Sequence, residues 1–297
     1  MTTRPVLAAD VGGTHMRAAL VDPRGHVLLR RSAATPGHAD VPAALIDLIR
    51  AVGAESDSGP ASHAVVGLPG AVDYESGCLL WAPHLPDGWP ELLSTTELSA
   101  QLDMPAHIAN DADLAAVGEA SFGAGAGIAD VAYLTISTGI GAGVLLGGRL
   151  MRGRRSLAEV GHTVIDWVAW RDGLPSTLEE LGSGSGVARL ACEAGLGDVD
   201  ARAVEVAAAD GEPRATTIWE GAIGACAAGV ANLVMSFYPS IFVIGGGLGR
   251  LAGFFDPACA LVLARPEHHP SDLTIVASAL GDDAGLVGAA GWEAAAG

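Results

Sequence analysis

Short apolar runs recur along the chain and alternate with polar, glycine-rich turns, which is typical of buried strands. The first run, residues 6–9, leads into the polar segment 10–14, DVGGT. A second run at 17–21 and a third at 27–29 are separated by the turn 22–25. This part of the sequence therefore predicts three successive strands joined by two turns.

The same order of elements returns more than a hundred residues later. Residues 131–136 form an apolar run, 137–141 a polar, glycine-rich turn and 142–146 a second run. The glycines at 147–148 and the short segment 149–151 complete the pattern. A repeat at this distance predicts two related domains, each of which presents a phosphate-binding turn to a shared cleft.

Helical spacing of apolar residues predicts helices between and after the strands. The predicted helices are 42–52, 91–102, one that follows Asp111 through Glu119, 178–194, 216–237 and 284–295, and further strands are 63–68, 106–109 and 241–244. Strands that alternate with helices argue for an α/β architecture. Segment 79–89, with two prolines and two tryptophans, is predicted to be irregular.

The apolar, uncharged stretch 222–249 is long enough to span a membrane. The break around Pro239 and the glycines near its end favour a buried helix followed by a buried strand. We therefore expect no membrane span here.

The charge composition excludes several classes of function. The formal net charge is −18, which argues against a nucleic-acid or anionic-membrane partner. All 16 basic residues are arginine, so the chain has no lysine for a P-loop, a protein-kinase site or a Schiff base. Any phosphate must be bound by backbone N–H groups, hydroxyls, arginine or a metal ion.

Four scattered cysteines, Cys78, Cys192, Cys226 and Cys259, show no paired spacing. We expect neither a disulfide framework nor a cysteine-based metal site, but reduced thiols in a cytoplasmic protein. The nine residues before Asp10 are too few for a signal peptide.

Two acidic positions follow predicted strands and are candidates for chemistry. Asp10 stands beside a turn of bare N–H groups, an arrangement that suits a polyphosphate sharing its charge with Mg²⁺. On these residues alone, an ordinary glycine-rich hairpin explains the turn equally well. Asp111 is a candidate general base at a strand end, and on spacing alone a helix cap is the competing interpretation.

Several motifs together resemble a known family. Three of them resemble the phosphate and adenosine motifs of the actin-like (ribonuclease H-like) sugar kinases: DVGGT at 10–14, STGIGAG at 137–143 and IGGGL at 244–248. Four more narrow the resemblance to the ROK family of repressors and sugar kinases: GLPGAVD at 67–73, ANDAD at 109–113, EVGH at 159–162 and GDDAGLVGAA at 281–290. The resemblance covers nearly the whole chain.

The resemblance implies a two-domain α/β fold of the actin-like type with a cleft between the domains. We expect a small N-terminal domain, 1–112 plus the C-terminal helix 284–297, and a large domain, 113–283. The sugar would lie at the cleft floor, and closure would exclude water. A homodimer is expected by family analogy.

The implied activity is glucokinase-like, with Mg-ATP phosphorylating the 6-hydroxyl of a hexose. Asp111 would be the general base, and Asp10 would hold Mg²⁺ directly or through water. Asp113 is expected to be a helix cap or solvated. The other implied site residues fall into groups by ligand: Gly70, Asn110, Asp111, Glu159, His162 and Glu179 for the sugar, with Glu180 as the rival of Glu179; Gly12, Gly13 and Thr14 for one phosphate; Thr138, Gly139 and Gly141 for another; Gly245 and Gly246 for the nucleoside.

The sequence departs from the family pattern in two places. The family's zinc knuckle has no counterpart, because segment 167–178 lacks cysteine, so we predict no zinc. Packing of Trp167, Leu174 and Pro175 is expected to hold this loop instead. His84 stands where the family more often has asparagine near the sugar.

These departures keep a second substrate class open, namely an amino or N-acyl sugar such as glucosamine, kanosamine or N-acetylmannosamine. A remote alternative is a non-catalytic, sugar-responsive regulator. The short segment before Asp10 and the acidic composition disfavour DNA binding.

Overall fold

The computed structural model describes residues 4–36, 41–56, 59–82 and 93–296. Strands and helices alternate along the chain, which confirms the predicted α/β class. The chain forms two compact units, one of residues 1–129, 143–158 and 279–297 and one of 130–142 and 159–278. The domain limits expected from the family resemblance remain a prediction.

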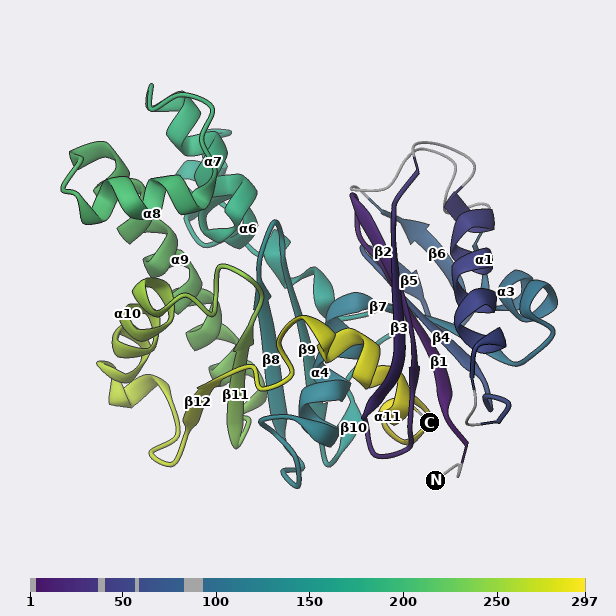
Figure 1. Ribbon diagram of the computed structural model, residues 1–297. Coiled ribbons are helices and arrows are strands. Elements are labelled where there is room, and N and C mark those ends of the chain that lie inside the picture. Colours follow the sequence, from purple (N-terminus) through teal and green to yellow (C-terminus); the bar gives the residue numbers. More distant parts are fainter. Residues whose placement is uncertain (1–3, 37–40, 57–58, 83–92, 297) are drawn as a thin grey trace. The chain divides into compact units, whose positions relative to one another are not determined.

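The first sheet holds the N-terminal strands in the order β3-β2-β1-β4-β7 (Figure 1). Its strands are β1 (Val6–Val11), β2 (His15–Val21), β3 (Val27–Ala34), β4 (Ala64–Leu68) and β7 (Ala106–Asn110). β1, β4 and β7 are mutually parallel, whereas β2 and β3 are antiparallel additions at one edge. The carboxyl ends of β1, β4 and β7 therefore meet at one edge of the sheet.

The second sheet repeats this order as β10-β9-β8-β11-β12. Its strands are β8 (Val131–Ile136), β9 (Ile140–Leu146), β10 (Arg149–Leu150), β11 (Ile241–Gly245) and β12 (Thr274–Ala277). β8, β11 and β12 are again parallel. The identical strand order confirms the internal repeat predicted from the sequence.

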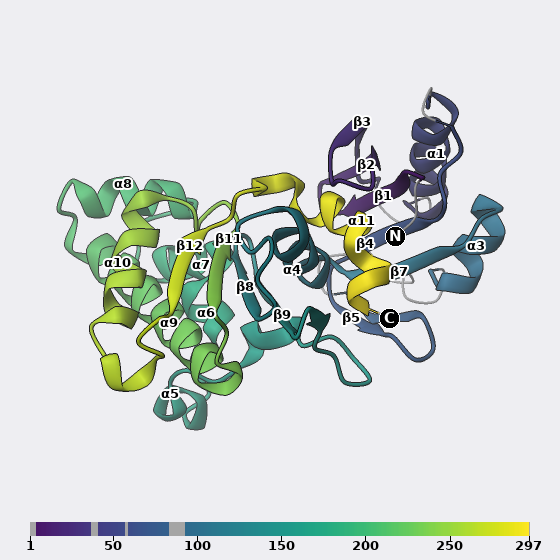
Figure 2. The ribbon, with the colours of Figure 1, turned by 90° about the horizontal axis from the view of Figure 1, so that it is seen from below.

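The helices of the first unit are α1 (Val41–Ala54), α3 (Thr95–Leu102), α4 (Asp111–Phe122) and α11 (Ala284–Ala296). Figures 1 and 2 show α11 lying along α4. Gly118 and Gly288 make this possible, because a Cβ at either would collide with backbone of the other helix. The C-terminal helix is thereby fixed beside the helix that begins at Asp111.

The second unit contains most of the remaining helices: η1 (Ala158–His162, whose first residue belongs to the first unit), α5 (Trp167–Arg171), α6 (Leu178–Gly182), α7 (Gly184–Glu193), α8 (Ala201–Ala209), α9 (Pro213–Phe237), α10 (Ala252–Leu263) and η2 (Pro266–His268). Within the described part of the chain, α9 alone is apolar and long enough to cross a membrane, and 56% of its most apolar 18-residue stretch is buried inside the protein. As predicted for 222–249, this helix is followed by a buried strand, β11.

Two sequence predictions of secondary structure were wrong, and several elements were missed. Residues 178–194 form two helices, since the Ser183 hydroxyl caps α7 by accepting from the Gly186 N–H at 3.0 Å. The segment predicted to be irregular begins with a strand, β6 (Cys78–Trp81), which pairs with β5 (Ala71–Asp73). Helices α8 and α10 and strand β12 were not predicted at all.

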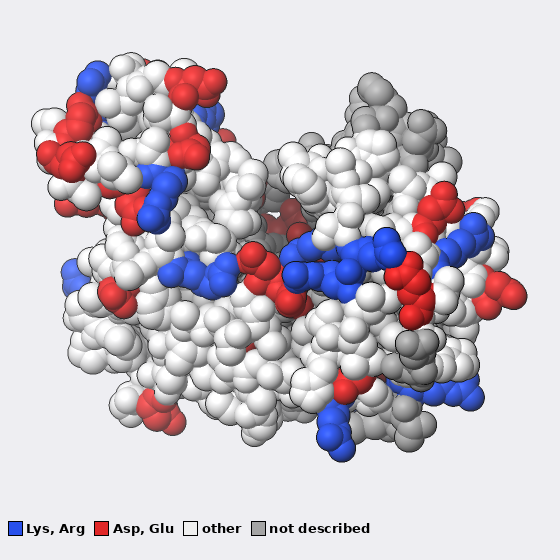
Figure 3. Space-filling model, viewed as in Figure 1, with Lys and Arg blue, Asp and Glu red and all other residues white. Residues whose placement is uncertain are grey.

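The surface charge is mixed. On the face seen in Figure 3, arginine side chains lie beside acidic ones. Arg30 pairs with Asp283 at 2.6 Å and Arg214 with Glu212 at 2.9 Å. Such exposed pairs contribute little to stability.

Candidate active site

Strand register places the first group of predicted site residues at one edge of the N-terminal sheet. Asp10 on β1 pairs with Gly67 on β4, and Gly67 pairs with Ala109 on β7. Asp111 comes two residues after Ala109. A Cβ at Gly67 would lie 3.7 Å from the Asp111 Cα, so the absence of a side chain there leaves space between the two carboxylate-bearing strand ends.

The β1–β2 turn carries the predicted phosphate-binding residues. Gly12 closes the turn by donating its N–H to the His15 carbonyl at 2.9 Å, while Gly13 and Thr14 are exposed. The N–H groups of Gly13 and Thr14 form no hydrogen bond within the described part of the chain. This turn can therefore offer two backbone donors to an anion.

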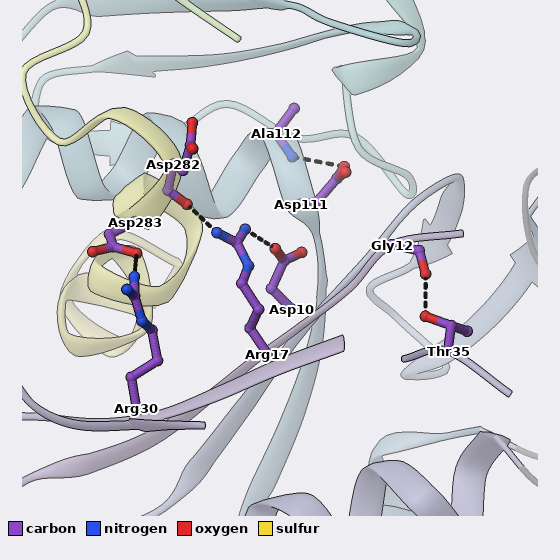
Figure 4. A network of polar contacts seen from close by, with 9 residues as sticks. All are labelled: Asp10, Gly12, Arg17, Arg30, Thr35, Asp111, Ala112, Asp282 and Asp283. Carbon is purple, nitrogen blue, oxygen red and sulfur yellow. Dashed lines mark hydrogen bonds and ion pairs between the residues drawn. The ribbon is translucent and has the colours of Figure 1, made fainter. Parts of the chain in front are cut away.

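Two residues that the sequence reasoning missed support this turn (Figure 4). The Thr35 hydroxyl donates to the Gly12 carbonyl at 2.7 Å, and the Thr35 N–H donates to the Thr14 carbonyl at 2.9 Å. Arg17 forms an ion pair with Asp10. Thr35 and Arg17 act through strand pairing, which leaves no motif in the sequence. The register of the hairpin is the signal that could have found them, because it places Arg17 opposite Asp10 and Thr35 just after β3.

The β7–α4 junction holds Asn110 and Asp111. The N-cap of α4 is Asn110, whose Oδ1 accepts from the N–H groups of Ala112 at 2.8 Å and Asp113 at 3.2 Å. Asp111 is the first residue of the helix, is only partly buried, and its Oδ1 also accepts from Ala112 N–H at 2.8 Å. Asn110 is thus the N-cap of α4, and Asp111 shares with it only the Ala112 N–H.

Asn110 also connects α4 to the turn at Gly70. Its Nδ2 donates to the Gly70 carbonyl at 3.0 Å. Gly70 has a φ of +94°, and a Cβ there would collide with the Trp81 carbonyl, so no other residue fits without rearrangement. One of the two Nδ2 hydrogens serves this contact.

Asp113 is neither a cap nor solvated, contrary to expectation. Its side chain is completely buried and its Oδ2 accepts from the Tyr74 hydroxyl at 2.7 Å. The same hydroxyl accepts from the Asn110 N–H at 3.1 Å. Burial, followed by the Asp113 charge, raises the pKa of Tyr74 well above its usual value, so the hydroxyl stays protonated.

In the second unit, Glu159, His162 and Glu179 lie together. Glu159 and His162 face one side of the short η1 helix, with His162 Nε2 3.4 Å from Glu159 Oε2. Burial, together with the nearby Glu179 charge, raises the pKa of Glu159, and His162 opposes this shift. A carboxylate of raised pKa beside an imidazole can accept from or donate to hydroxyl groups of a ligand.

The geometry also separates Glu179 from Glu180. Glu179 Oε2 accepts from the Ile140 N–H at 2.8 Å, next to the predicted phosphate turn. Glu180 is occupied in a capping box with Thr177, accepting from the Ser176 and Thr177 N–H groups at 2.9 and 3.0 Å. These hydrogen bonds lower the pKa of Glu180. Glu179 is therefore the better candidate of the two for a ligand.

The β8–β9 turn contains Thr138, Gly139 and Gly141. The Gly184 N–H donates to the Ser137 carbonyl at 2.7 Å, and the Ser185 hydroxyl to the Thr138 carbonyl at 2.7 Å. The start of α7 is thus attached to this turn, which explains why helix 178–194 is interrupted there. Thr138 itself is exposed, with its side chain available to a ligand.

A cavity of about 500 Å³ opens beside this turn. Its lining includes Ser137, Thr138, Ser185, Gly247, Leu248 and Leu251. Gly245 and Gly246, expected at the nucleoside, are not among the residues that line this cavity: a Cβ at Gly245 would strike the Tyr133 ring, and one at Gly246 the Ile136 backbone. Gly247 is the glycine of this motif whose missing side chain leaves open space, since nothing lies within 4 Å of the place that a Cβ would take there.

The loop that replaces the zinc knuckle is not held as predicted. Trp167 and Leu174 are 65% and 59% exposed, so they do not fill a gap in this unit. Instead, Val164 forms a β-bridge with Thr177, and the Ile165 N–H donates to the Ser176 carbonyl at 2.8 Å. Backbone pairing and the Thr177–Glu180 capping box close the loop.

Two further expectations concern metal and His84. Within the described ranges, no group of three or more His, Cys, Asp or Glu side chains is placed to hold a metal ion. Absence of zinc stays a prediction. His84 lies outside the described residues.

Two sheets of identical order, with carboxylates and glycine turns at their strand ends, define an actin-like ATPase fold, as predicted. The chain belongs to the ROK family, because the model of that family matches residues 6–295.

Three similar proteins bear on the function. The bifunctional enzyme NanE/NanK of Brucella melitensis biotype 1 is 39% identical over 96% of this chain, but the match covers 53% of its own length. The chain thus spans about half the length of the curated bifunctional relatives that it matches. The N-acetylmannosamine kinase of Salmonella arizonae is 30% identical, with 98% of this chain and 97% of the relative covered.

The third is a solved structure, a ROK family glucokinase from Streptomyces griseus in complex with glucose and AMPPNP. It superposes with a TM-score of 0.77 at 31% identity, covering 96% of this chain and 98% of the other.

Proposed function

We propose that this protein is an ATP-dependent sugar kinase that phosphorylates the 6-hydroxyl of a hexose, with glucose as the substrate. The observation that carries the proposal is the strand register that brings Asp10 and the Asp111 helix start to one sheet edge. Parallel α/β sheets gather ligands at the carboxyl ends of their strands. The similarity to a glucokinase that binds glucose and AMPPNP supports both substrates.

Asp111 is the proposed general base. The carboxylate accepts the proton of the sugar 6-hydroxyl while that oxygen attacks the γ-phosphorus, and the bond from phosphorus to the ADP oxygen breaks. Asn110 is the N-cap of α4, so the helix does not depend on Asp111 as its cap.

Asp10 and the two glycine turns are proposed to bind the nucleotide phosphates. Mg²⁺, held by Asp10, would neutralise charge on the phosphates. Gly12, Gly13 and Thr14 would contact one phosphate, and Thr138, Gly139 and Gly141 another. Gly245 and Gly246 would shape the nucleoside segment, with the adenosine in the cavity beside Gly247 and Leu248.

The proposed sugar ligands are Gly70, Asn110, Asp111, Glu159, His162 and Glu179. Carboxylates, an amide and an imidazole together can both donate to and accept from sugar hydroxyls. Glu179 is preferred over Glu180 because Glu180 is engaged in the capping box.

The decisive experiment compares wild type with Asp111→Asn in a coupled ADP-release assay with glucose. Loss of the base should lower kcat by about 10²–10⁴-fold, while calorimetry still detects glucose binding. If Asp111→Asn kept more than a few per cent of the wild-type rate, the base would lie elsewhere.

A second substrate class is favoured by the N-acetylmannosamine kinase relative. The same assay with glucose, glucosamine, kanosamine and N-acetylmannosamine ranks these sugars by kcat/KM. An amino or N-acyl sugar with the highest value would replace glucose as the substrate. Sugar binding without turnover of any of them would favour a non-catalytic regulator.

We further propose a homodimer in the cytoplasm. The four cysteines are free thiols, as in a reducing compartment. Light scattering of the purified protein tests the dimer, and cell fractionation tests the location.

A further inference from the structure

Arg17 and Asp10 face one another across the β1–β2 hairpin. Their Cα atoms are partners in the antiparallel register, and Arg17 Nη2 forms an ion pair with Asp10 Oδ2. Both side chains are largely withdrawn from solvent, with 29% and 21% of their surfaces exposed. An ion pair in such a setting is screened less than one at the surface.

The Arg17 guanidinium has a second anchor. Its Nη1 donates to the Asp282 carbonyl at 2.8 Å, in the short helix η3 (Gly281–Asp283) that precedes α11. An arginine guanidinium stays protonated at physiological pH. Arg17 is therefore a permanent cation fixed by a backbone carbonyl as well as by Asp10.

The segment that supplies this carbonyl is itself held in place. Glu119, which is fully buried on α4, accepts the N–H of Ala279 at 3.2 Å and of Leu280 at 2.9 Å. Arg30 on β3 donates to Asp283 Oδ1 at 2.6 Å. Arg17 thus joins Asp10 to the η3 segment of the first unit, as Figure 4 shows.

We propose that Arg17 is a positioning residue for phosphoryl transfer, which holds Asp10 Oδ2 so that the other carboxylate oxygen serves the metal of Mg-ATP. In Figure 4 that other oxygen points away from Arg17, on the side of Asp111. This role rests on the proposed kinase function and on Asp10 as the metal-binding residue. Planar, two-point donation is a property of arginine that lysine does not reproduce.

The alternative is that Arg17 competes with the metal for Asp10. The two roles predict opposite effects of removing the guanidinium. Loss of a positioning group weakens metal binding, typically about 10- to 100-fold for groups that orient a metal ligand. Loss of a competitor strengthens it.

The test compares wild type, Arg17→Met, Arg17→Lys and the control Arg30→Met. Arg30 contacts the same η3 helix through Asp283, whereas the ion pair with Asp10 is made by Arg17. Calorimetry measures ATP affinity with and without Mg²⁺, and the coupled assay measures the Mg²⁺ concentration for half-maximal rate and the sugar KM. Thermal unfolding reports whether each variant folds.

We expect Arg17→Met to lose about 10-fold or more of the Mg²⁺-dependent gain in ATP affinity, with an unchanged sugar KM. The Mg²⁺-dependent gain in ATP affinity of Arg17→Lys should lie between those of wild type and Arg17→Met. Arg30→Met should match wild type in its Mg²⁺ dependence. If Arg17→Lys or Arg17→Met bound Mg-ATP as tightly as wild type or more tightly, the proposed role of Arg17 would be overturned, while the kinase function would still stand. A wild type that turns over no sugar and shows no Mg²⁺-dependent ATP binding overturns the kinase function as well.

Discussion

The Tyr74 hydroxyl donates a hydrogen bond to Asp113 Oδ2 at 2.7 Å while it accepts one from the Asn110 N–H at 3.1 Å. These two residues flank Asp111 in the sequence. Tyr74 itself follows strand β5, so a residue from a distant turn holds the Asn110 backbone on one side of the proposed base and the Asp113 side chain on the other. The Arg152 guanidinium lies over the Tyr74 ring, 4.9 Å from the centroid.

Replacing Tyr74 with phenylalanine should therefore affect both stability and turnover. Asn110 and Asp113 lose a buried partner, which costs about 1–3 kcal/mol of unfolding free energy. A displaced Asp111 should lower kcat roughly 10- to 100-fold, with the KM for ATP little changed. Denaturant unfolding and steady-state kinetics measure the two effects. Tyr238→Phe, at a 60% exposed residue, is the matched control, and equal kinetics for both variants would contradict the prediction.

Enlarging Gly247 should block the cavity beside the β8–β9 turn. Nothing lies within 4 Å of the position of an added Cβ, so Gly247→Leu is expected to fold normally. Its side chain would enter the proposed adenosine cavity and raise the KM for ATP about tenfold or more, equivalent to roughly 1.4 kcal/mol of binding energy. The sugar KM should stay at the wild-type value.

The control for this prediction is Gly221→Leu on α9, where an added Cβ also meets nothing within 4 Å but no part of the cavity is present. Gly246→Leu should instead lower the melting temperature, because Gly246 has a φ of +81° and lies against the Ile136 backbone. Unchanged ATP kinetics in Gly247→Leu would place the nucleoside outside this cavity.

The pKa shifts of Glu159 and Glu180 predict stability changes of opposite sign with pH. Because burial raises the pKa of Glu159, its contribution to folding is fully present below its unfolded pKa and is lost as pH rises through the folded pKa. Glu159→Gln should therefore gain in melting temperature relative to wild type as the pH is raised from the acid range to neutrality.

Glu180 serves as the internal comparison. Hydrogen bonds from Ser176 and Thr177 lower its pKa, so its contribution is present above the unfolded pKa and is lost as pH falls through the folded one. Glu180→Gln should be less stable than wild type at neutral pH, with the difference shrinking toward acid pH. Parallel pH profiles for the two variants would contradict these assignments.

The loop between Val164 and Thr177 should be independent of zinc. We expect that treatment with a chelator leaves the melting temperature unchanged, and that metal analysis of the dialysed protein finds no tightly bound zinc. One zinc per chain that survives dialysis would refute this prediction.

Thr177→Ala should instead weaken this loop. The variant loses the capping box with Glu180, a change that typically costs about 1 kcal/mol of unfolding free energy. Thr217→Ala, on an exposed hydroxyl inside α9, is a suitable comparison because that hydroxyl donates to the Pro213 carbonyl of its own helix and caps no helix start. Denaturant unfolding measures both, and equal losses would argue against the capping role.

Much of this protein could be predicted from its sequence, because the determining interactions are local or periodic. The apolar runs and glycine turns at 6–29 and 131–151 predicted the repeated sheet order that the structure contains. The same local signals brought Asp10 and Asp111 forward as candidates, and the family motifs added Glu159, His162 and Glu179.

The tertiary structure decided what depends on pairing between distant segments. Strand register sets Arg17 against Asp10. Asp282 lies within reach of Arg17 in a segment that is held by Glu119 just before η3 and by Arg30 at Asp283. Tyr74 reaches Asp113 across a turn, and attachment of Gly184 to the Ser137 carbonyl interrupts a helix that apolar spacing alone would continue. A hydrogen bond between residues far apart in the chain leaves no period in the sequence, and for that physical reason these partners became visible only in the folded protein.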